Sequence, residues 1–319
     1  MEKLHHVRGE PKSKKGEPLK RMETKREWWS RGTLMIEELL QDARRLEEEG
    51  LVGEAADRYL EAVKAAEKEG DKLFLGQVCL EAGLFYTRIN LPEKALEFYR
   101  KSLEAFEATG NEEGVADAAY NLCVAHLELD EYEEAEKHGV RAIKIYRKIG
   151  LEEGVADAAY ALGLVYAGRG ELERGLKSLE EALRIYRKEG NEEGVSSVLL
   201  DIGEIYYRRG ETDKAAEYYR KALKVAEEMG DKLSTAYLTR RIGDIYDEKG
   251  ELRRMINSYL KAAYMYVEEG EREAAKELID EVERRLWDLP KSTRRTVVKK
   301  LDEIRDAIER TEGVVGEEP

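Results

Sequence analysis

The fold is decided by the stretch GNEEGVADAAYNL at residues 110–122, because it recurs forty residues later as GLEEGVADAAYAL at 150–162. A weaker copy, GNEEGVSSVLLDI, occupies residues 190–202. Glycines mark the same step along most of the chain, at Gly70, Gly110, Gly150, Gly190, Gly230 and Gly270. A period of this size is typical of a stack of similar supersecondary units rather than of one globular core.

Each repeat is predicted to be a pair of antiparallel helices. In the repeat at residues 156–195, the first half places small or apolar residues at helical spacing, at Ala159, Leu162, Gly163 and Tyr166. The second half does the same at Gly175, Leu176, Leu179, Ala182, Leu183 and Tyr186. Gly170 and Gly190 are expected to end the two helices, and Asn191 to cap the next one.

Glycines also recur in the middle of the first helix of the repeats, at Gly83, Gly163, Gly203 and Gly243. A mid-helix glycine costs about 1 kcal/mol relative to alanine, so its repetition at one position needs a reason. We expect the second helix to cross there, with small residues facing the glycines, at Ala95, Ala135, Gly175 and Ala215.

This pattern of small, tyrosine and alanine positions resembles the tetratricopeptide repeat over residues 34–275, which would hold six units. The resemblance implies an all-α, right-handed superhelical solenoid. The forty-residue length resembles the repeats of the cell-polarity adaptor family that includes LGN and Pins. In that family an Asn after the mid-helix glycine binds peptide backbone, whereas here that position holds Leu84, Val124, Leu164, Glu204 and Asp244.

The segments on either side of the repeats differ from them. Residues 1–33 carry ten Lys or Arg against five Glu and have no helical period, so we expect a basic, disordered tail. Trp28 and Trp29 in this tail would pack on the first repeat or, alternatively, dock into the groove as a self-ligand. Residues 276–319 are predicted to form capping helices and a frayed end, with a dimerisation helix as the alternative.

Composition limits the classes of function. The chain has 319 residues and a net charge of −14. Its body should therefore repel nucleic acid, which the basic tail could bind only weakly. No apolar run approaches the roughly 18 residues of a membrane helix, and we expect a cytoplasmic protein with reduced Cys79 and Cys123. Only two Gln and five Asn in so charged a chain suggest a heat-adapted source.

The sequence contains no pattern typical of catalysis or of cofactor or metal binding, so we expect no enzyme and no cofactor. His126 replaces the tyrosine of its repeat and is expected to be a packing residue. His138 falls on a charged helix face and is expected to be solvated. The same repeat has Cys123 at the glycine position and Gly139 at the aromatic position of the second helix, which indicates local repacking.

The candidate site is the face that the first helices would line. Its predicted residues run from an apolar and aromatic middle to an acidic end: Leu80, Leu84, Tyr120, Val124, Leu127, Tyr160, Leu164, Glu204, Tyr207, Asp244 and Asp247. Such a groove suits an adaptor that binds an apolar or amphipathic, partly basic segment of another protein or peptide. The alternative is a regulator whose superhelix closes around a small ligand or short peptide. The partner's identity and the oligomeric state stay open.

Overall fold

The computed structural model describes residues 25–314, with side chains from residue 32 to residue 310. Regular structure in this range consists of fourteen α-helices and one short 3-10 helix, with no strand. The described residues fall into two compact units, which meet in sequence between Asp71 and Lys72. The predicted all-α solenoid of antiparallel helix pairs is confirmed.

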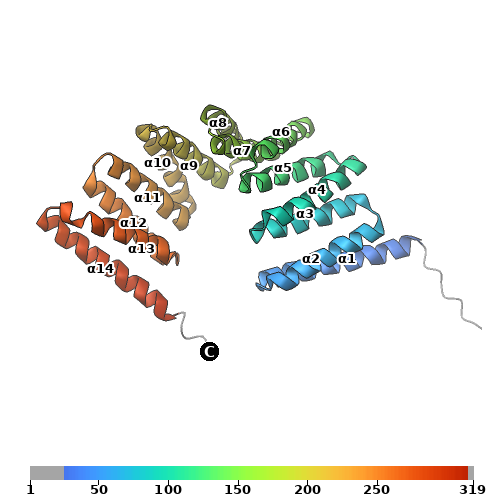
Figure 1. Ribbon diagram of the computed structural model, residues 1–319, viewed down its shortest axis with the longest axis horizontal. Coiled ribbons are helices and arrows are strands. Elements are labelled where there is room, and N and C mark those ends of the chain that lie inside the picture. The colour runs from blue at the N-terminus through green and yellow to red at the C-terminus, as the bar shows by residue number, and fades with distance from the viewer. Residues whose placement is uncertain (1–24, 315–319) are drawn as a thin grey trace, which may run out of the picture. The chain divides into compact units, whose positions relative to one another are not determined.

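The first unit is one helix pair, α1 (Lys25–Glu48) and α2 (Val52–Glu69), shown in Figure 1. We expected residues 1–33 to precede the first helix, but α1 begins at Lys25 and runs through Gly32. A single glycine costs a helix only about 1 kcal/mol relative to alanine, which does not by itself end it. The side chains of Trp28 and Trp29, like residues 1–24 of the expected tail, lie outside the described part of the chain.

The second unit contains five further helix pairs. In each pair we call the odd-numbered helix the first helix and the even-numbered helix the second. The pairs are α3 (Lys72–Arg88) with α4 (Pro92–Thr109), α5 (Glu112–Glu128) with α6 (Tyr132–Ile149), α7 (Glu152–Gly168) with α8 (Leu172–Glu189), α9 (Glu192–Arg208) with α10 (Thr212–Met229), and α11 (Lys232–Glu248) with α12 (Leu252–Glu268). Each second helix packs against its own first helix and, from α4 to α12, against the first helix that follows it.

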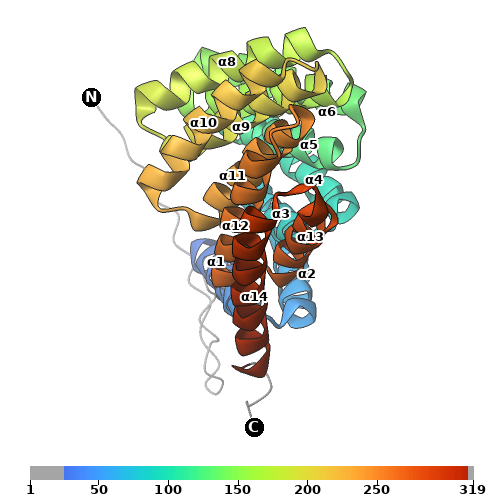
Figure 2. The same ribbon diagram turned by 90° about the vertical axis from the view of Figure 1, so that its left-hand side faces the viewer.

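Three helical segments close the second unit. They are α13 (Arg272–Arg284), the 3-10 helix η1 (Leu286–Asp288) and α14 (Lys291–Val314), and α14 packs along α12 (Figure 2). The helix expected to run to Trp287 ends earlier, and Trp287 is 74% exposed. Leu278, Val282, Leu301 and Ile304 join the buried cluster of α12, so these helices cover the apolar end of the last pair.

The turns between helices follow the expected chemistry. Gly110 and Gly190 adopt left-handed backbone with φ of 71° and 72°, which ends α4 and α8. Asn111 then accepts a 3.1 Å hydrogen bond from the backbone N–H of Gly114 and caps α5. Within two of the pairs the left-handed turn residue is Asn90 or Asp130, two residue types that tolerate this conformation.

The mid-helix glycines make room for the partner helix. A Cβ on Gly203 would lie 2.5 Å from a ring carbon of Tyr219. The same arrangement occurs at Gly83 with Tyr99 and at Gly243 with Tyr259. At Gly163 the Leu179 side chain lies nearest, 2.6 Å from the position of a Cβ, and the Gly175 carbonyl oxygen follows at 3.4 Å. Close crossing is therefore general, but a large side chain, Tyr in three pairs and Leu in the fourth, lies nearest the glycine where a small residue was expected.

The pair α5 and α6 is repacked, as its sequence indicated. A Cβ on Gly139 would lie 2.9 Å from the Cys123 sulfur. In this pair the larger side chain at the crossing therefore belongs to the first helix and the glycine to the second, the reverse of the other pairs of the second unit. His126 is buried, and its Nδ1 lies 2.5 Å from a Glu131 carboxylate oxygen. The prediction that His138 is solvated is wrong: its side chain is 14% exposed and stacks on His126 at 5.6 Å. Burial lowers the pKa of His138 to about 4.

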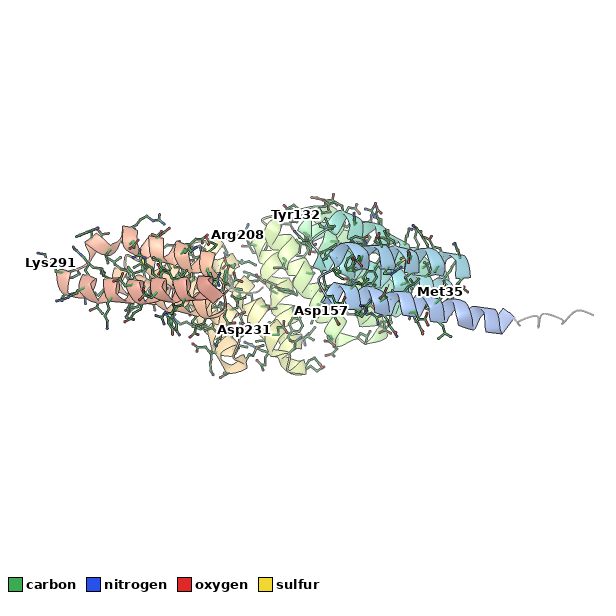
Figure 3. All side chains as sticks on the ribbon, turned by 90° about the horizontal axis from the view of Figure 1, so that it is seen from below. Met35, Tyr132, Asp157, Arg208, Asp231 and Lys291 are labelled. Atoms are coloured by element: carbon green, nitrogen blue, oxygen red, sulfur yellow. The ribbon has the colours of Figure 1, made fainter. Side chains whose placement is uncertain are left out.

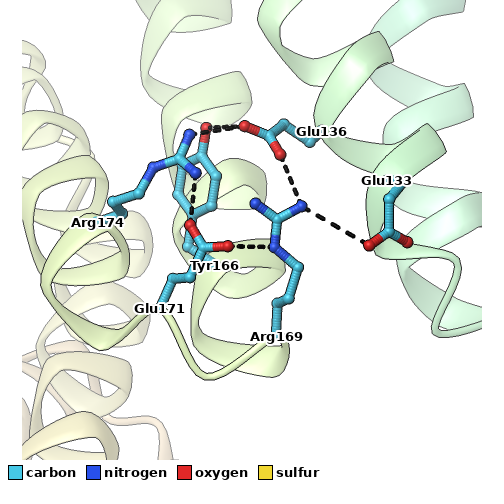
Figure 4. A network of polar contacts seen from close by, with 6 residues as sticks. All are labelled: Glu133, Glu136, Tyr166, Arg169, Glu171 and Arg174. Carbon is cyan, nitrogen blue, oxygen red and sulfur yellow. Dashed lines mark hydrogen bonds and ion pairs between the residues drawn. The ribbon is translucent and has the colours of Figure 1, made fainter.

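Ion pairs join successive repeats on the surface. In the network of Figure 4, Glu136 of α6 pairs with Arg169 at 2.8 Å and with Arg174 at 2.6 Å. Glu171 connects the same two arginines, and the Arg174 guanidinium lies over the Tyr166 ring at 3.9 Å. Lys148 with Glu112 and Lys188 with Glu152 form further pairs, each within one helix pair. Networks of this kind gain value as temperature rises.

Candidate binding groove

The first helices of the second unit form a common face. α3 packs against α5, α5 against α7, and α7 against α9. In Figure 1, α5, α7 and α9 lie on the inner side of their pairs, and α6, α8 and α10 lie on the outer side. Residues of the first helices that point away from their own second helix are therefore brought side by side.

The predicted apolar residues lie along this face. We call Leu80, Leu84, Tyr120, Val124, Leu127, Tyr160 and Leu164 the apolar row. Leu84 is 36% exposed, and the others are half-buried. Tyr120, Val124 and Leu127 pack against a small buried cluster that includes Cys123 and Ala161. The apolar row is thus partly buried in the core and partly exposed. A ligand on this face would contact the edges of rings and methyl groups rather than whole side chains.

Three aspartates lie on the same first helices; the helical register that predicts the candidate site also places Asp117 and Asp157 on its inward side, but not Asp201. Tyr146 donates to Asp117 at 2.7 Å and Tyr186 donates to Asp157, labelled in Figure 3, at 2.5 Å. Tyr160, a predicted site residue, donates to Asp201 of the next pair at 2.7 Å. The first two pairs follow one pattern: an aspartate in the first helix and a tyrosine 29 residues later in the second helix. This spacing is the sequence signal from which these two hydrogen bonds could have been predicted.

Burial disfavours the charged form of these carboxylates. It raises the pKa of Asp117 and Asp157, against the lowering effect of their tyrosine donors. The effect is larger at Asp201, whose pKa burial raises to about 6 although Tyr160 donates to it. Asp201 therefore changes its charge near neutral pH, in the middle of the face.

Arg241 links two of the predicted acidic residues and was missed as a site residue. Its guanidinium binds Glu204 through two hydrogen bonds of 2.6 and 2.7 Å and Asp244 through one of 2.6 Å. Burial works against the charge on Arg241, but Glu204, Tyr219 and Asp244 outweigh it and raise its pKa. One guanidinium therefore offsets only one of the two negative charges of Glu204 and Asp244. The helical period placed Glu204 and Asp244 on this face. It did not predict the ion pair between Glu204 and Arg241, which lie 37 residues apart in the sequence.

A pocket of about 520 Å³ between α9, α11, α12 and α13 is lined mainly by carboxylates. We call it the acidic pocket, and three predicted residues, Tyr207, Asp244 and Asp247, line it. Its other lining residues are Arg240, Glu248, Tyr259, Glu277, Leu278, Asp280, Glu281 and Arg284. Arg240 pairs with Glu277 at 3.6 Å and Arg284 with Glu281 at 2.5 Å. Carboxylates outnumber cations, so the acidic pocket suits a Lys or Arg side chain.

A second pocket, of about 580 Å³, lies where α9 and α11 begin. Its apolar lining includes Leu200, Leu233 and Tyr237, of which Leu233 is 45% and Tyr237 38% exposed. Glu193, Asp231 and Glu271 add carboxylates, and Asp231 also caps α11 by accepting from the Ser234 N–H. The helical register that predicts the candidate site also places Ser197, Leu200 and Tyr237, which line this pocket, on the inward side of the first helices.

The described residues contain no group of three or more His, Cys, Asp or Glu side chains that could hold a metal ion. Burial raises the pKa of the Cys123 thiol to about 12, which makes it a poor nucleophile. Within the described range, no helix has the length and apolar character needed to cross a bilayer.

The fold and its groove define a helical repeat protein. A sequence profile of the tetratricopeptide repeat matches residues 76–148, 154–228 and 195–266, which together make up more than half of the chain. The chain belongs to the tetratricopeptide repeat family. The finer resemblance to the LGN and Pins form of the repeat stays a prediction. A search of curated proteins found no match.

Solved structures of tetratricopeptide-type proteins resemble the chain. RapI in its apo form matches with a TM-score of 0.60 and 14% identity, over 83% of this chain and 99% of RapI. A Rap protein complexed with Competence and Sporulation Factor matches with a TM-score of 0.57 and 15% identity, over 86% and 77%. A signal transduction ATPase with a tetratricopeptide repeat sensor from Pyrococcus horikoshii matches with a TM-score of 0.61 and 19% identity, over 90% of this chain and 45% of the ATPase. At these identities the likeness shows the fold alone.

Proposed function

We propose that this protein is an interaction scaffold whose groove binds an apolar or amphipathic segment that carries Lys or Arg. The observation that carries the proposal is the apolar row on the first helices, followed along the stack by the acidic pocket. A bound segment would lay its apolar side chains on the apolar row and place a cation in the acidic pocket. We further propose that the protein works in the cytoplasm, which the buried reduced thiol of Cys123 supports.

The two parts of the groove would contribute differently. Apolar contacts with half-buried rings set most of the affinity, and truncating an aromatic anchor such as Tyr120 is expected to cost about 2 kcal/mol of binding free energy. The acidic pocket would orient the segment and speed its association. Because Arg241 offsets part of the charge on Glu204 and Asp244, and Arg285 pairs with Asp247, the steering charge would come mainly from residues such as Glu248 and Asp280.

A second candidate is a regulator that responds to a peptide or small ligand, and the pocket at the start of α9 and α11 favours it. Its volume of about 580 Å³ and its mixed apolar and acidic lining fall in the range of small-ligand sites. The Rap protein complexed with Competence and Sporulation Factor and the tetratricopeptide repeat sensor share the fold, which is compatible with this reading.

The scaffold proposal is tested by capturing partners from the source organism with immobilised protein. Leu84→Glu places a charge on the apolar row, and its exposed position should leave the fold intact. The matched control is Val140→Glu, which makes a similar change at a 45% exposed aliphatic residue of the second helix α6. We expect Leu84→Glu to lose partners that Val140→Glu retains. Retention by both variants would place binding elsewhere than on the apolar row.

A further inference from the structure

A cleft of about 800 Å³ lies on the second helices, away from the groove. It is bounded by the end of α4, the beginning of α5 and the C-terminal half of α6. Its lining residues are Glu107, Gly110, Glu112, Val115, Arg141, Lys144, Ile145, Arg147 and Lys148. It shares no lining residue with the acidic pocket or with the apolar row.

The charge of this cleft is opposite to that of the protein. Four cations and two glutamates line it, although the chain as a whole carries −14. Arg141 pairs with Glu107 and Lys148 with Glu112, and Arg147 reaches out of the cleft to Glu181 of α8 at 2.6 Å. For Lys144, the described part of the chain supplies no ion-pair partner.

The complete set of four cations is particular to α6 among the second helices. At the four corresponding positions, α8 has Glu181, Arg184, Arg187 and Lys188, α10 has Lys221, Lys224, Glu227 and Glu228, and α4 has Lys101, Glu104, Glu107 and Ala108. Cations in the last turn of α6 are favoured by the helix dipole, which accounts for Arg147 and Lys148. The dipole effect is confined to the last turn, so it does not account for Arg141 and Lys144.

The cleft also has an apolar floor. Val115 is buried at its base, and half-buried Ile145 packs on the core between the cations. A ligand that fits such a lining carries carboxylates together with an aliphatic or aromatic side chain. Nucleic acid matches it less well, because its backbone brings no apolar group and the acidic body repels a polyanion.

We propose that this cleft is a docking site for an acidic segment of a partner protein that also carries apolar side chains. The ion pairs that now cross the cleft are exposed, and such pairs are worth only about 0–1 kcal/mol. Carboxylates of an incoming segment can therefore replace Glu107 and Glu112 at little cost. The site is independent of the proposed groove and takes the opposite charge, so the scaffold could hold two chemically different partners.

The test uses the full chain and a short fluorescein-labelled peptide in which glutamates alternate with leucines. Fluorescence anisotropy should show saturable binding that weakens at high salt. Lys144→Glu breaks no ion pair of the described residues and should weaken binding about tenfold, since it replaces an attraction by a repulsion. The matched control is Lys224→Glu, at the same helix position in α10, where the exposed lysine pairs with Glu228. It should bind like the wild type.

Specificity for the apolar component is tested in parallel. A peptide with serines in place of the leucines should bind more weakly than the glutamate–leucine peptide, and so should the Ile145→Ser variant. Four results would overturn the proposal: no saturable binding by the wild type, equal binding by Lys144→Glu, equal loss in Lys224→Glu, or displacement of the peptide by single-stranded DNA at equal charge. Self-association that Lys144→Glu abolishes in sedimentation experiments would overturn it in favour of a second copy of this chain.

Discussion

Replacing Gly203 by alanine tests the close crossing of the two helices in a repeat. The new Cβ would lie 2.5 and 2.6 Å from two ring carbons of Tyr219, whereas carbon atoms pack at about 3.5–4.0 Å. The ring must therefore move by about 1 Å. It is fully buried, and its hydroxyl donates to Glu204 at 2.8 Å.

The expected loss follows from two opposing effects. Overpacking of this kind costs about 1–3 kcal/mol, and the better helix propensity of alanine returns about 1 kcal/mol. We expect the free energy of unfolding to fall by about 1–2 kcal/mol, measured by urea denaturation with circular dichroism. Gly53→Ala is the control, because nothing lies within 4 Å of its Cβ, and it should leave stability unchanged or raise it.

The cause of the loss can be checked with a second substitution. In a Tyr219→Ala background the ring is absent, so adding Gly203→Ala should no longer reduce the free energy of unfolding. A Gly203→Ala variant as stable as the wild type would refute the reasoning. So would a loss of equal size in the Tyr219→Ala background.

Two further predictions concern charged groups. The pKa of Asp201 is raised to about 6 in the folded state. The buried carboxylate therefore lowers the free energy of unfolding at pH values above 6, and this loss disappears as the pH falls below the pKa of the unfolded chain. Asp201→Asn, which can still accept from Tyr160, should therefore raise the free energy of unfolding at pH 8 by about 2–3 kcal/mol and have little effect at pH 4; an effect independent of pH would contradict this. At Glu136, burial opposes ionisation, but Arg174, Tyr166 and Arg169 outweigh it and lower the pKa, so its contribution is present above the unfolded pKa and lost in acid. Glu136→Gln should lower the melting temperature at pH 7 but not at pH 2, with a loss of about 1 kcal/mol or less; equal melting at pH 7 would show that the network of Figure 4 adds nothing.

The repeat pattern predicted the helix pairs and turns because these depend on local residues. Gly110 and Asn111 end one helix and cap the next through their own backbone and side chain. Contacts that cross between repeats were not predicted. The helical period places Arg241 near a face but does not show that its guanidinium reaches Glu204, and a charged neighbourhood hid the burial of His138. The Arg241 contact joins residues 37 apart in the sequence, and the burial of His138 comes from its packing against His126 of the preceding helix.

The groove is tested most directly by hydrogen–deuterium exchange of the protein with and without a partner segment that the wild type captures and Leu84→Glu loses. Binding in the groove predicts slower exchange in the first helices α3, α5 and α7, which carry the apolar row, and around the acidic pocket. Exchange in the second helices α4, α6 and α8 should change little. Protection confined to the second helices would contradict the proposal that the first helices form the binding surface.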